Sequence, residues 1–139
     1  MKIIFSDMEG KTVLVVPLVN PPLKFGQTNK HETFETLKYG DIVLIGGKGL
    51  KTVEWSSFFP QKKSFYDFVQ YLADEFGKTY VKFLEEHSEE PFRLIILDGV
   101  KTIRNMLVVV DNFEYEYDKM GNIQYSVKLV EFPDNASNL

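Results

Sequence analysis

Short runs dominated by β-branched and aromatic residues make up most of this chain, and several alternate hydrophobic with polar positions. A period of two is typical of β-strands that have one buried face. Lys2–Phe5 and Thr12–Val16 flank the turn residues Met8–Lys11 and so predict an N-terminal hairpin. Beyond Asn20–Pro22, where proline removes a backbone donor, the pattern predicts three more strands. They lie over Thr28–Tyr39, Ile42–Ile45 and Leu50–Phe58.

The middle of the chain changes to a helical period. Apolar residues recur at i, i+3, i+4, i+7 and i+11, which places them on one face of a helix. They are Phe65, Phe68, Val69, Leu72 and Phe76. Ser64 is a suitable N-cap for a helix over Ser64–Phe76, and Asp67 completes a shortened capping box. The same face resumes from Tyr80 to Leu84, after the weak helix former Gly77. This pattern predicts one kinked helix or two helices, and two are favoured.

The last third returns to strand patterns. Phe92–Leu97 is followed by the turn dipeptide Asp98-Gly99, and a long strand over Met106–Tyr117 is expected to bend near Asn112. A turn over Lys119–Asn122 leads into a last strand, Ile123–Phe132. The order β, helix, β predicts a single α+β domain over residues 1–139. Its sheet is expected to be mainly antiparallel, either open or barrel-like, with one or two helices inserted between the β halves.

Composition excludes several classes of function. The chain has 139 residues, no cysteine and a formal net charge of −4. Without cysteine it has no disulfides, thiol nucleophiles or cysteine metal sites. An acidic chain is poorly suited to a nucleic-acid backbone, which attracts a surplus of lysine and arginine. No apolar run reaches the roughly 18 residues of a membrane span. We therefore expect neither nucleic acid nor membrane as a partner.

A glycine-rich segment, Ile45–Thr52, has some features of a phosphate-binding loop. Such a loop ends in Gly-Lys-Ser/Thr and opens a helix, whose amides hold the phosphate. Here Lys48 precedes the last glycine, Gly49, and the residues that follow have a strand pattern. The sequence therefore favours a tight β-corner over Gly46–Gly49, and no cofactor is expected.

The ionisable side chains show no ligand spacing. Three acids lie on one face of the long strand and could hold a hard cation. They are Glu114, Glu116 and Asp118. No loop supplies the backbone carbonyls of a calcium site, so a solvated face with Lys128 as cross-strand partner is favoured. His31 and His87, the only histidines, lack metal-ligand spacing; His87 is expected at a helix C-terminus. We predict no metal site and no catalytic residues.

The segment Trp55–Pro60 concentrates aromatic residues at the end of a strand. Trp and Phe are enriched at interface hot spots, which favours a contact with a partner protein. The same residues could instead lie in the core beneath the helix, and the sequence gives these alternatives equal weight. The candidate interface residues are Trp55, Phe58, Phe59 and Phe65, with the exposed side of Phe65–Phe76.

The same segment carries a family resemblance. Ile42–Pro60, with Gly47-Lys48-Gly49-Leu50 and Ser56-Ser57-Phe58-Phe59-Pro60, resembles the XkdP-like family of tail and baseplate proteins from PBSX-type prophages and related Gram-positive phages. Pro91–Ile96 and Asn105–Glu116 are similar to two further strands of that family. The resemblance covers about residues 14–133. Typical members continue into a peptidoglycan-binding LysM module, for which this chain has no room, so cell-wall binding is not expected to carry over.

The resemblance implies a structural protein of a phage tail, located near the hub or tube end. Its partners would be tail tube, tape-measure, hub or spike proteins, and it would form a homo-oligomeric ring in a particle assembled in the bacterial host cytoplasm. One alternative is a small module that binds a ligand or cell-wall glycan on its aromatic cluster. Another is a hydrolase built on Asp98, Asp111 and Glu114, which would need perturbed carboxylates in a pocket. We expect no enzyme.

Overall fold

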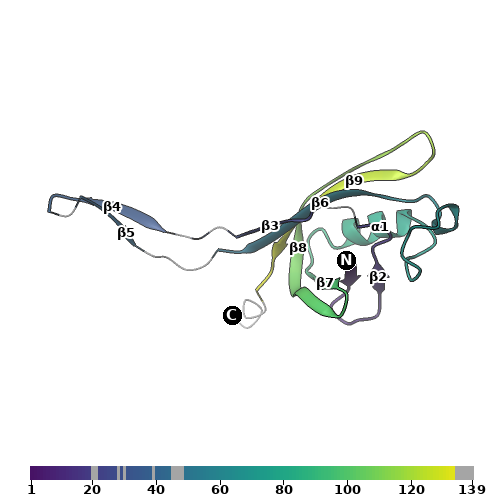
Figure 1. Ribbon diagram of the computed structural model, residues 1–139, viewed down its shortest axis with the longest axis horizontal. Coiled ribbons are helices and arrows are strands. Elements are labelled where there is room, and N and C mark those ends of the chain that lie inside the picture. The colour runs from purple at the N-terminus through teal and green to yellow at the C-terminus, as the bar shows by residue number, and fades with distance from the viewer. Residues whose placement is uncertain (20–21, 28, 30, 39, 45–48, 134–139) are drawn as a thin grey trace.

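Most of the chain forms one antiparallel sheet in the computed structural model, which describes residues 1–19, 22–27, 29, 31–38, 40–44 and 49–133 (Figure 1). Seven strands pair in the order β2-β1-β7-β8-β9-β6-β3. They are β1 Lys2–Ser6, β2 Val13–Val15, β3 Lys24–Gln27, β6 Lys51–Phe59, β7 Phe92–Asp98, β8 Lys101–Tyr117 and β9 Ile123–Glu131. β2 and β3 are the edges, and the sheet is open. The α+β prediction is confirmed, whereas closure into a barrel is not.

Two expected features of the strands are confirmed. β1 and β2 form the N-terminal hairpin, with Ile4 opposite Val15. The long strand β8 changes register against β9 between Val110 and Asn112, which is the bend expected near Asn112. β3, which pairs with the first half of β6, was not predicted because its four exposed residues carry no alternation.

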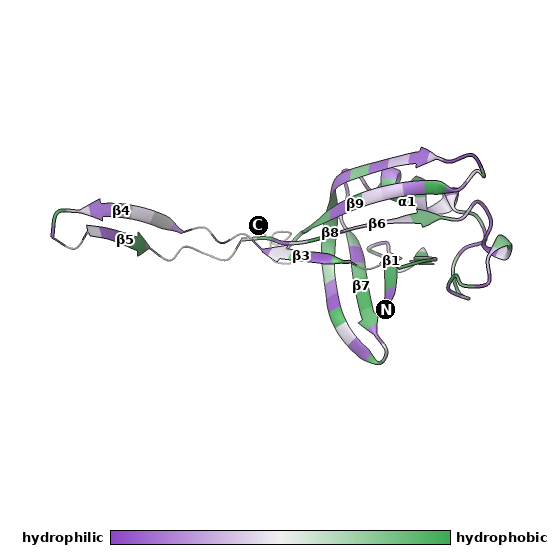
Figure 2. Ribbon diagram, turned by 45° about the horizontal axis from the view of Figure 1, so that its top comes forward, coloured by the Kyte–Doolittle hydropathy of each residue, from purple (hydrophilic) through white to green (hydrophobic). Residues whose placement is uncertain are grey.

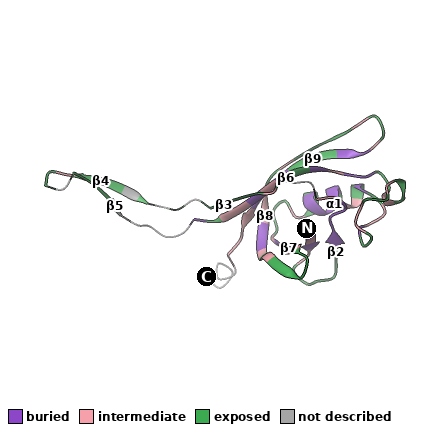
Figure 3. Ribbon diagram, in the orientation of Figure 1, coloured by how far each residue is buried: buried purple, intermediate pink, exposed green. Residues whose placement is uncertain are grey.

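One α-helix, α1 Lys78–Glu86, is present in the described part of the chain, and it packs its apolar face against the sheet (Figure 3). Tyr80, Val81, Phe83 and Leu84 are buried on that face. Phe83 stacks on Phe5 of β1, with ring centroids 5.9 Å apart, and meets Phe92 of β7 edge-on at 5.2 Å. Aromatic burial of this kind supplies much of the core's stabilisation. His87 caps the C-terminus of α1, as expected.

The Tyr80 hydroxyl connects α1 to two other parts of the chain. It donates a hydrogen bond to the Val15 carbonyl of β2 and accepts one from the Asp74 backbone N–H at 2.8 Å. Burial raises the pKa of Tyr80 well above its usual value, so the hydroxyl stays protonated as a donor. The helix is therefore held in place by polar contacts as well as by packing.

The predicted helix over Ser64–Phe76 is wrong. The structure has only a 3₁₀ turn there, η1 Lys63–Phe65, followed by loops and turns up to Gly77. The Ser64 hydroxyl, which was expected to cap a helix, donates to Glu75 at 2.7 Å and helps to close the segment on itself. Amphipathic spacing produces a helix only when the apolar face has something to pack against, and here that face is exposed.

A two-stranded ribbon extends away from the sheet. β4 Glu32–Thr36 and β5 Gly40–Leu44 pair only with each other in the described structure, and Figures 1 and 2 show them far from the other strands. The strand predicted over Thr28–Tyr39 is therefore shorter than expected. Most of the predicted glycine corner, residues 46–48, lies outside the described residues.

Candidate protein–protein interface

Alternation along β6 decides where the aromatic candidates point. Val53, Trp55 and Phe59 face the core, and Trp55 and Phe59 are 4% and 0% exposed. Trp55 Nε1 donates to the Tyr125 hydroxyl at 2.9 Å. Phe59 stacks on Tyr125 at 3.9 Å and on Tyr80 at 4.9 Å between centroids. Two of the four candidate interface residues are thus core residues in the folded chain, which was one of the two alternatives left open by the sequence.

The other two candidates lie at the surface. Phe58, on the opposite face of β6, is half-buried and meets the rings of Tyr66 and Phe68 edge-on at 5.8 and 6.5 Å. Phe65 is 59% exposed, and the Lys62 ammonium lies 5.8 Å from its ring centroid. These contacts join the end of β6 to the segment that follows it.

Residues 62–76 form a protruding aromatic lobe. Its exposed large side chains are Phe65, Phe68, Tyr71, Leu72 and Phe76. Lys63 donates to the Tyr71 carbonyl oxygen at 2.9 Å and lies 5.6 Å from the Tyr71 ring centroid. Large apolar side chains gathered at a surface are typical of interaction sites and unusual in a solvated loop. The lobe is the strongest candidate for a protein–protein interface on the body of the molecule.

The lobe is fixed to the sheet at defined points. The buried Asn122 side chain, at the end of the β8–β9 turn, accepts from the Gln61 backbone N–H at 3.0 Å and donates to the Tyr66 hydroxyl at 2.6 Å. The Lys63 backbone N–H donates to the Glu75 carbonyl oxygen at 2.7 Å and closes the base of the lobe. An ordered, pre-formed surface loses less conformational entropy when it binds a partner.

The Asn122 contact was missed by sequence reasoning. Its only signal is the turn spacing Asp118-x-x-Gly121, in which Gly121 has a positive φ of 82°. The Asp118 carboxylate accepts from Gln124 Nε2 and from the backbone N–H groups of Met120 and Asn122. Partial burial of the carboxyl opposes the shift, but these hydrogen bonds outweigh it and lower the pKa of Asp118.

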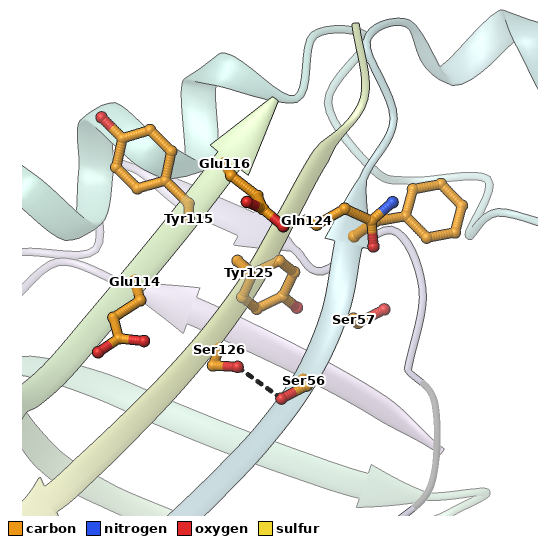
Figure 4. A pocket seen from close by; sticks show the side chains of 9 residues that line it. Ser56, Ser57, Glu114, Tyr115, Glu116, Gln124, Tyr125 and Ser126 are labelled. Carbon is orange, nitrogen blue, oxygen red and sulfur yellow. Dashed lines mark hydrogen bonds between the residues drawn. The ribbon is translucent and has the colours of Figure 1, made fainter. Parts of the chain in front are cut away.

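A second surface feature is an open hollow of about 630 Å³ on the polar face of β6, β9 and β8 (Figure 4). Ser56 and Ser126 share a hydrogen bond of 2.7 Å at its floor. Glu114 and Glu116 stand opposite Ser126 and Gln124 in the β8–β9 register. The hollow thus presents hydroxyl, amide and carboxylate groups.

The aromatic rings that line the hollow do not form a stacking platform. Tyr125 is 4% exposed and belongs to the core. Tyr115 leans towards α1, where its hydroxyl donates to Glu85 at 3.0 Å, and this bond raises the pKa of Tyr115. Phe58 alone shares the outer face, and its ring contacts the lobe. A glycan site needs rings aligned beside polar groups, so this geometry gives the ligand-binding alternative no support.

The acids considered for hydrolysis are not gathered together. Asp98 stands opposite Lys101 in the β7–β8 register, at one end of β8. Asp111 lies ten residues further along that strand, or about 33 Å away at the usual rise, and contacts Lys128 at 3.7 Å. In the described ranges, no three acids or histidines lie close enough together to hold a metal ion. Lys128 was expected to pair across the strands with the face that carries Glu114, Glu116 and Asp118, but in the described structure its ion pair is with Asp111 instead.

The two histidines lie apart from each other and from the lobe. His87 Nδ1 lies 2.8 Å from the Phe83 carbonyl oxygen, and its ring stacks on Phe83, a packing role that needs no ligand. His31 is exposed just before β4. None of the helices in the described part of the chain has the length and apolar character needed to cross a membrane.

Comparisons with known proteins find similarity both in sequence and in fold. The chain is 26% identical over 132 residues to the uncharacterized protein YqbP of Bacillus subtilis strain 168. That match covers 92% of this chain but only 58% of YqbP, so the chain spans little more than half of that relative. No family model matches the chain, and the resemblance to the XkdP-like family therefore stays a prediction.

The fold is shared with a chain from the tail of an empty GTA particle refined with C6 symmetry. The TM-score is 0.55, and the superposition covers 95% of this chain and 91% of that one. At 12% sequence identity, this likeness shows a common fold. It includes nearly all of both chains, so the fold is shared as a whole rather than through one hairpin or helix.

Proposed function

We propose that this chain is a structural component of the tail of a phage or phage-like particle and acts through protein–protein contacts without catalysis. The observation that carries the proposal is a fold shared over 95% of the chain with a chain from a particle tail. The resemblance to tail and baseplate proteins points in the same direction.

The surface of the molecule supports an assembly role. The aromatic lobe exposes large apolar side chains that a free-standing domain would bury, and interfaces are enriched in such aromatic residues. The ribbon of β4 and β5 extends beyond the body of the molecule, where it can reach a neighbour (Figure 1). Extended arms and exposed aromatic patches suit assembly, whereas an enzyme gathers its polar groups in an enclosed cleft.

We further propose that the chain lies at the baseplate hub or tube end of the tail, as a ring of identical subunits that contacts tube, tape-measure, hub or spike proteins. The particle would assemble in the bacterial host cytoplasm. The C6 symmetry of the particle tail with the similar fold supports a ring. Rings of more than two subunits join two different patches of each subunit head to tail, and this chain has two dissimilar surfaces, the lobe and the ribbon.

Mass spectrometry of purified particles tests the proposal. Tails or virions induced from the source strain would be isolated by density gradient, and the copy number of this chain would be measured against a capsid protein. We expect a small fixed number of copies that is a multiple of three or six. Absence from intact particles would overturn the proposal, and a pull-down with insoluble peptidoglycan would then test the glycan-binding alternative.

A further inference from the structure

The described residues 31–38 and 40–44 form the ribbon of β4 and β5, here called the arm hairpin. β4 and β5 pair with each other and with no other described strand. A two-stranded ribbon alone is marginally stable in water. Leu37 at its turn is fully exposed, and Val43 is 58% exposed. These apolar side chains have no cover in the described structure of the subunit, so the arm hairpin needs a surface against which to pack.

The charges of the arm hairpin point to the chemistry of that surface. Glu35 of β4 stands directly opposite Asp41 of β5. Like charges in directly opposed positions destabilise a strand pair. Neither acid forms an ion pair within the part of the chain that the structure describes. A partner surface that supplies cations beside apolar groups would relieve this repulsion and bury Leu37 and Val43 at the same time.

The aromatic lobe has this composition. Lys62 and Lys63 lie over the rings of Phe65 and Tyr71, so each cation is next to an exposed apolar group. Neither lysine has an acidic partner among the described residues. Tyr71, which is 87% exposed, provides the most accessible ring. The lobe also carries the acids Asp67, Asp74 and Glu75. Asp74 accepts a hydrogen bond from the Thr79 hydroxyl and Glu75 accepts one from the Ser64 hydroxyl, so both are engaged within the subunit. Lys62 and Lys63 therefore form a local cationic site beside exposed rings, and this part of the lobe complements the acids and apolar groups of the arm hairpin.

The two surfaces cannot meet within one subunit. The arm hairpin lies between the end of β3 and the start of β6, whereas the lobe follows the end of β6, at the opposite end of the molecule (Figure 1). A contact between them must join two molecules. Because the two patches differ, the contact is head-to-tail, and repeating it generates a closed ring or an open filament.

We propose that the arm hairpin of one copy docks on the aromatic lobe of a second copy, with Glu35 and Asp41 facing Lys62 and Lys63. This inference rests on the proposed function, since it assigns the contact that joins subunits of the ring. The apolar groups at the tip of the arm pack against the lobe rings, and the acid pair fixes the orientation through charge.

Cysteine crosslinking tests the contact directly, because the chain contains no cysteine of its own. Leu37→Cys is placed on one population of the full chain and Tyr71→Cys on another, and the two are mixed at high concentration with a short bis-maleimide. Val100→Cys is the matched control, since Val100 is as fully exposed as Leu37 but lies in the β7–β8 turn. We expect the 37–71 crosslink to form at least tenfold faster than the 37–100 crosslink.

A charge exchange identifies the facing groups. Glu35→Lys with Asp41→Lys, placed on the Leu37→Cys chain, should reduce the 37–71 crosslink at least tenfold. Lys62→Glu with Lys63→Glu on the Tyr71→Cys chain should do the same. When both reversed chains are mixed, the crosslink should recover to within about threefold of the original rate. Circular dichroism checks that each variant is folded. Equal 37–71 and 37–100 rates, or a loss that the double reversal fails to restore, would overturn the inference.

The same crosslink in purified particles separates this inference from the proposed function. With Leu37→Cys and Tyr71→Cys on one chain, we expect a ladder of covalently joined subunits. Particles that contain the chain but give no ladder would overturn the arm–lobe contact and leave the tail role standing. A chain that is absent from particles but crosslinks between residues 37 and 71 in solution would overturn the tail role and retain the contact.

Discussion

Tyr125 provides a buried hydrogen-bond acceptor and an aromatic ring to the core. Its hydroxyl accepts the indole N–H of Trp55, and its ring stacks on Phe59 and lies near Phe113. Burial raises the pKa of Tyr125 well above the usual value for tyrosine, so the hydroxyl remains neutral over the working range of pH. A buried indole N–H that lost this acceptor would remain unsatisfied.

Removal of that hydroxyl should therefore be costly. We expect Tyr125→Phe to lower the free energy of unfolding by about 1–3 kcal/mol, because the Trp55 donor stays buried without a partner. Urea denaturation followed by tryptophan fluorescence measures the loss, since Trp55 is the only tryptophan. Tyr117→Phe is the control: its ring is 63% exposed, and the change should stay within about 0.5 kcal/mol. Equal losses in the two variants would contradict this account.

Asp118 should make stability depend on acid pH. Hydrogen bonds in the β8–β9 turn hold its pKa below the usual value in the folded chain. Its contribution is therefore present above the unfolded pKa of about 4 and is lost as pH falls through the folded pKa. We expect the urea midpoint of the original chain to fall more steeply below about pH 4 than that of Asp118→Asn. Parallel curves for the two proteins would show that this carboxylate is not linked to folding.

At the scale of the element, Gly77 allows the chain between the lobe and α1 to pass close to the end of β6. A Cβ at this position would collide with the Pro60 carbonyl oxygen and would lie 3.0 Å from the Phe59 Cβ. The chain can pass so close to the end of β6 only because residue 77 has no side chain. This close approach brings the base of the lobe against the core.

Gly77→Ala should destabilise the fold even though alanine is the better helix former. We expect a loss of about 1–3 kcal/mol from overpacking against Pro60 and Phe59. Lys78→Ala, at the exposed first residue of α1, is the control and should change stability by less than about 0.5 kcal/mol. Thermal unfolding measures both variants. A gain in stability for Gly77→Ala would mean that the close approach is relieved in solution.

The same elements show how far the sequence can predict the fold. Periodicity found the strands whose alternating side chains are buried, and it found α1 because Tyr80–Leu84 has a sheet to cover. It failed over Ser64–Phe76, where the spacing is helical but the apolar face remains exposed. Spacing reports which side chains share a face and does not report what lies opposite that face. β3 was missed because all four of its residues are exposed, so they show no alternation of apolar and polar positions.

Part of the candidate interface could be predicted from the alternation of side chains along β6. Counting by two from Val53 places Trp55 and Phe59 on one face of β6 and Phe58 on the other, so the division between core and surface was present in the sequence. The lysines that lie over the rings of Phe65 and Tyr71 could not be found, because these contacts depend on loop geometry. The opposed acids Glu35 and Asp41 appear only once the register of β4 and β5 is known.

At the scale of the whole molecule, the body should fold without the arm. β4 and β5 pair only with each other, so replacing residues 28–48 with a short turn leaves every pairing of the seven-stranded sheet intact. We expect the melting temperature to change by less than about 3 °C, which corresponds to under ~1 kcal/mol for a chain of this size. Calorimetry measures this, with the original chain as reference. A body that no longer folds would show that the arm contributes to the core.

The 17 residues of β8 also have a mechanical consequence. The strand runs from the β7–β8 turn to the β8–β9 turn and pairs with β7 along its first half and with β9 along its second. Antiparallel hydrogen bonds lie perpendicular to the strands. A force that pulls β7 and β9 apart along the strand direction would pass through β8 and load each ladder in shear, so many bonds would have to break together rather than open one by one. The molecule is therefore built to transmit tension along this strand from one end of its body to the other.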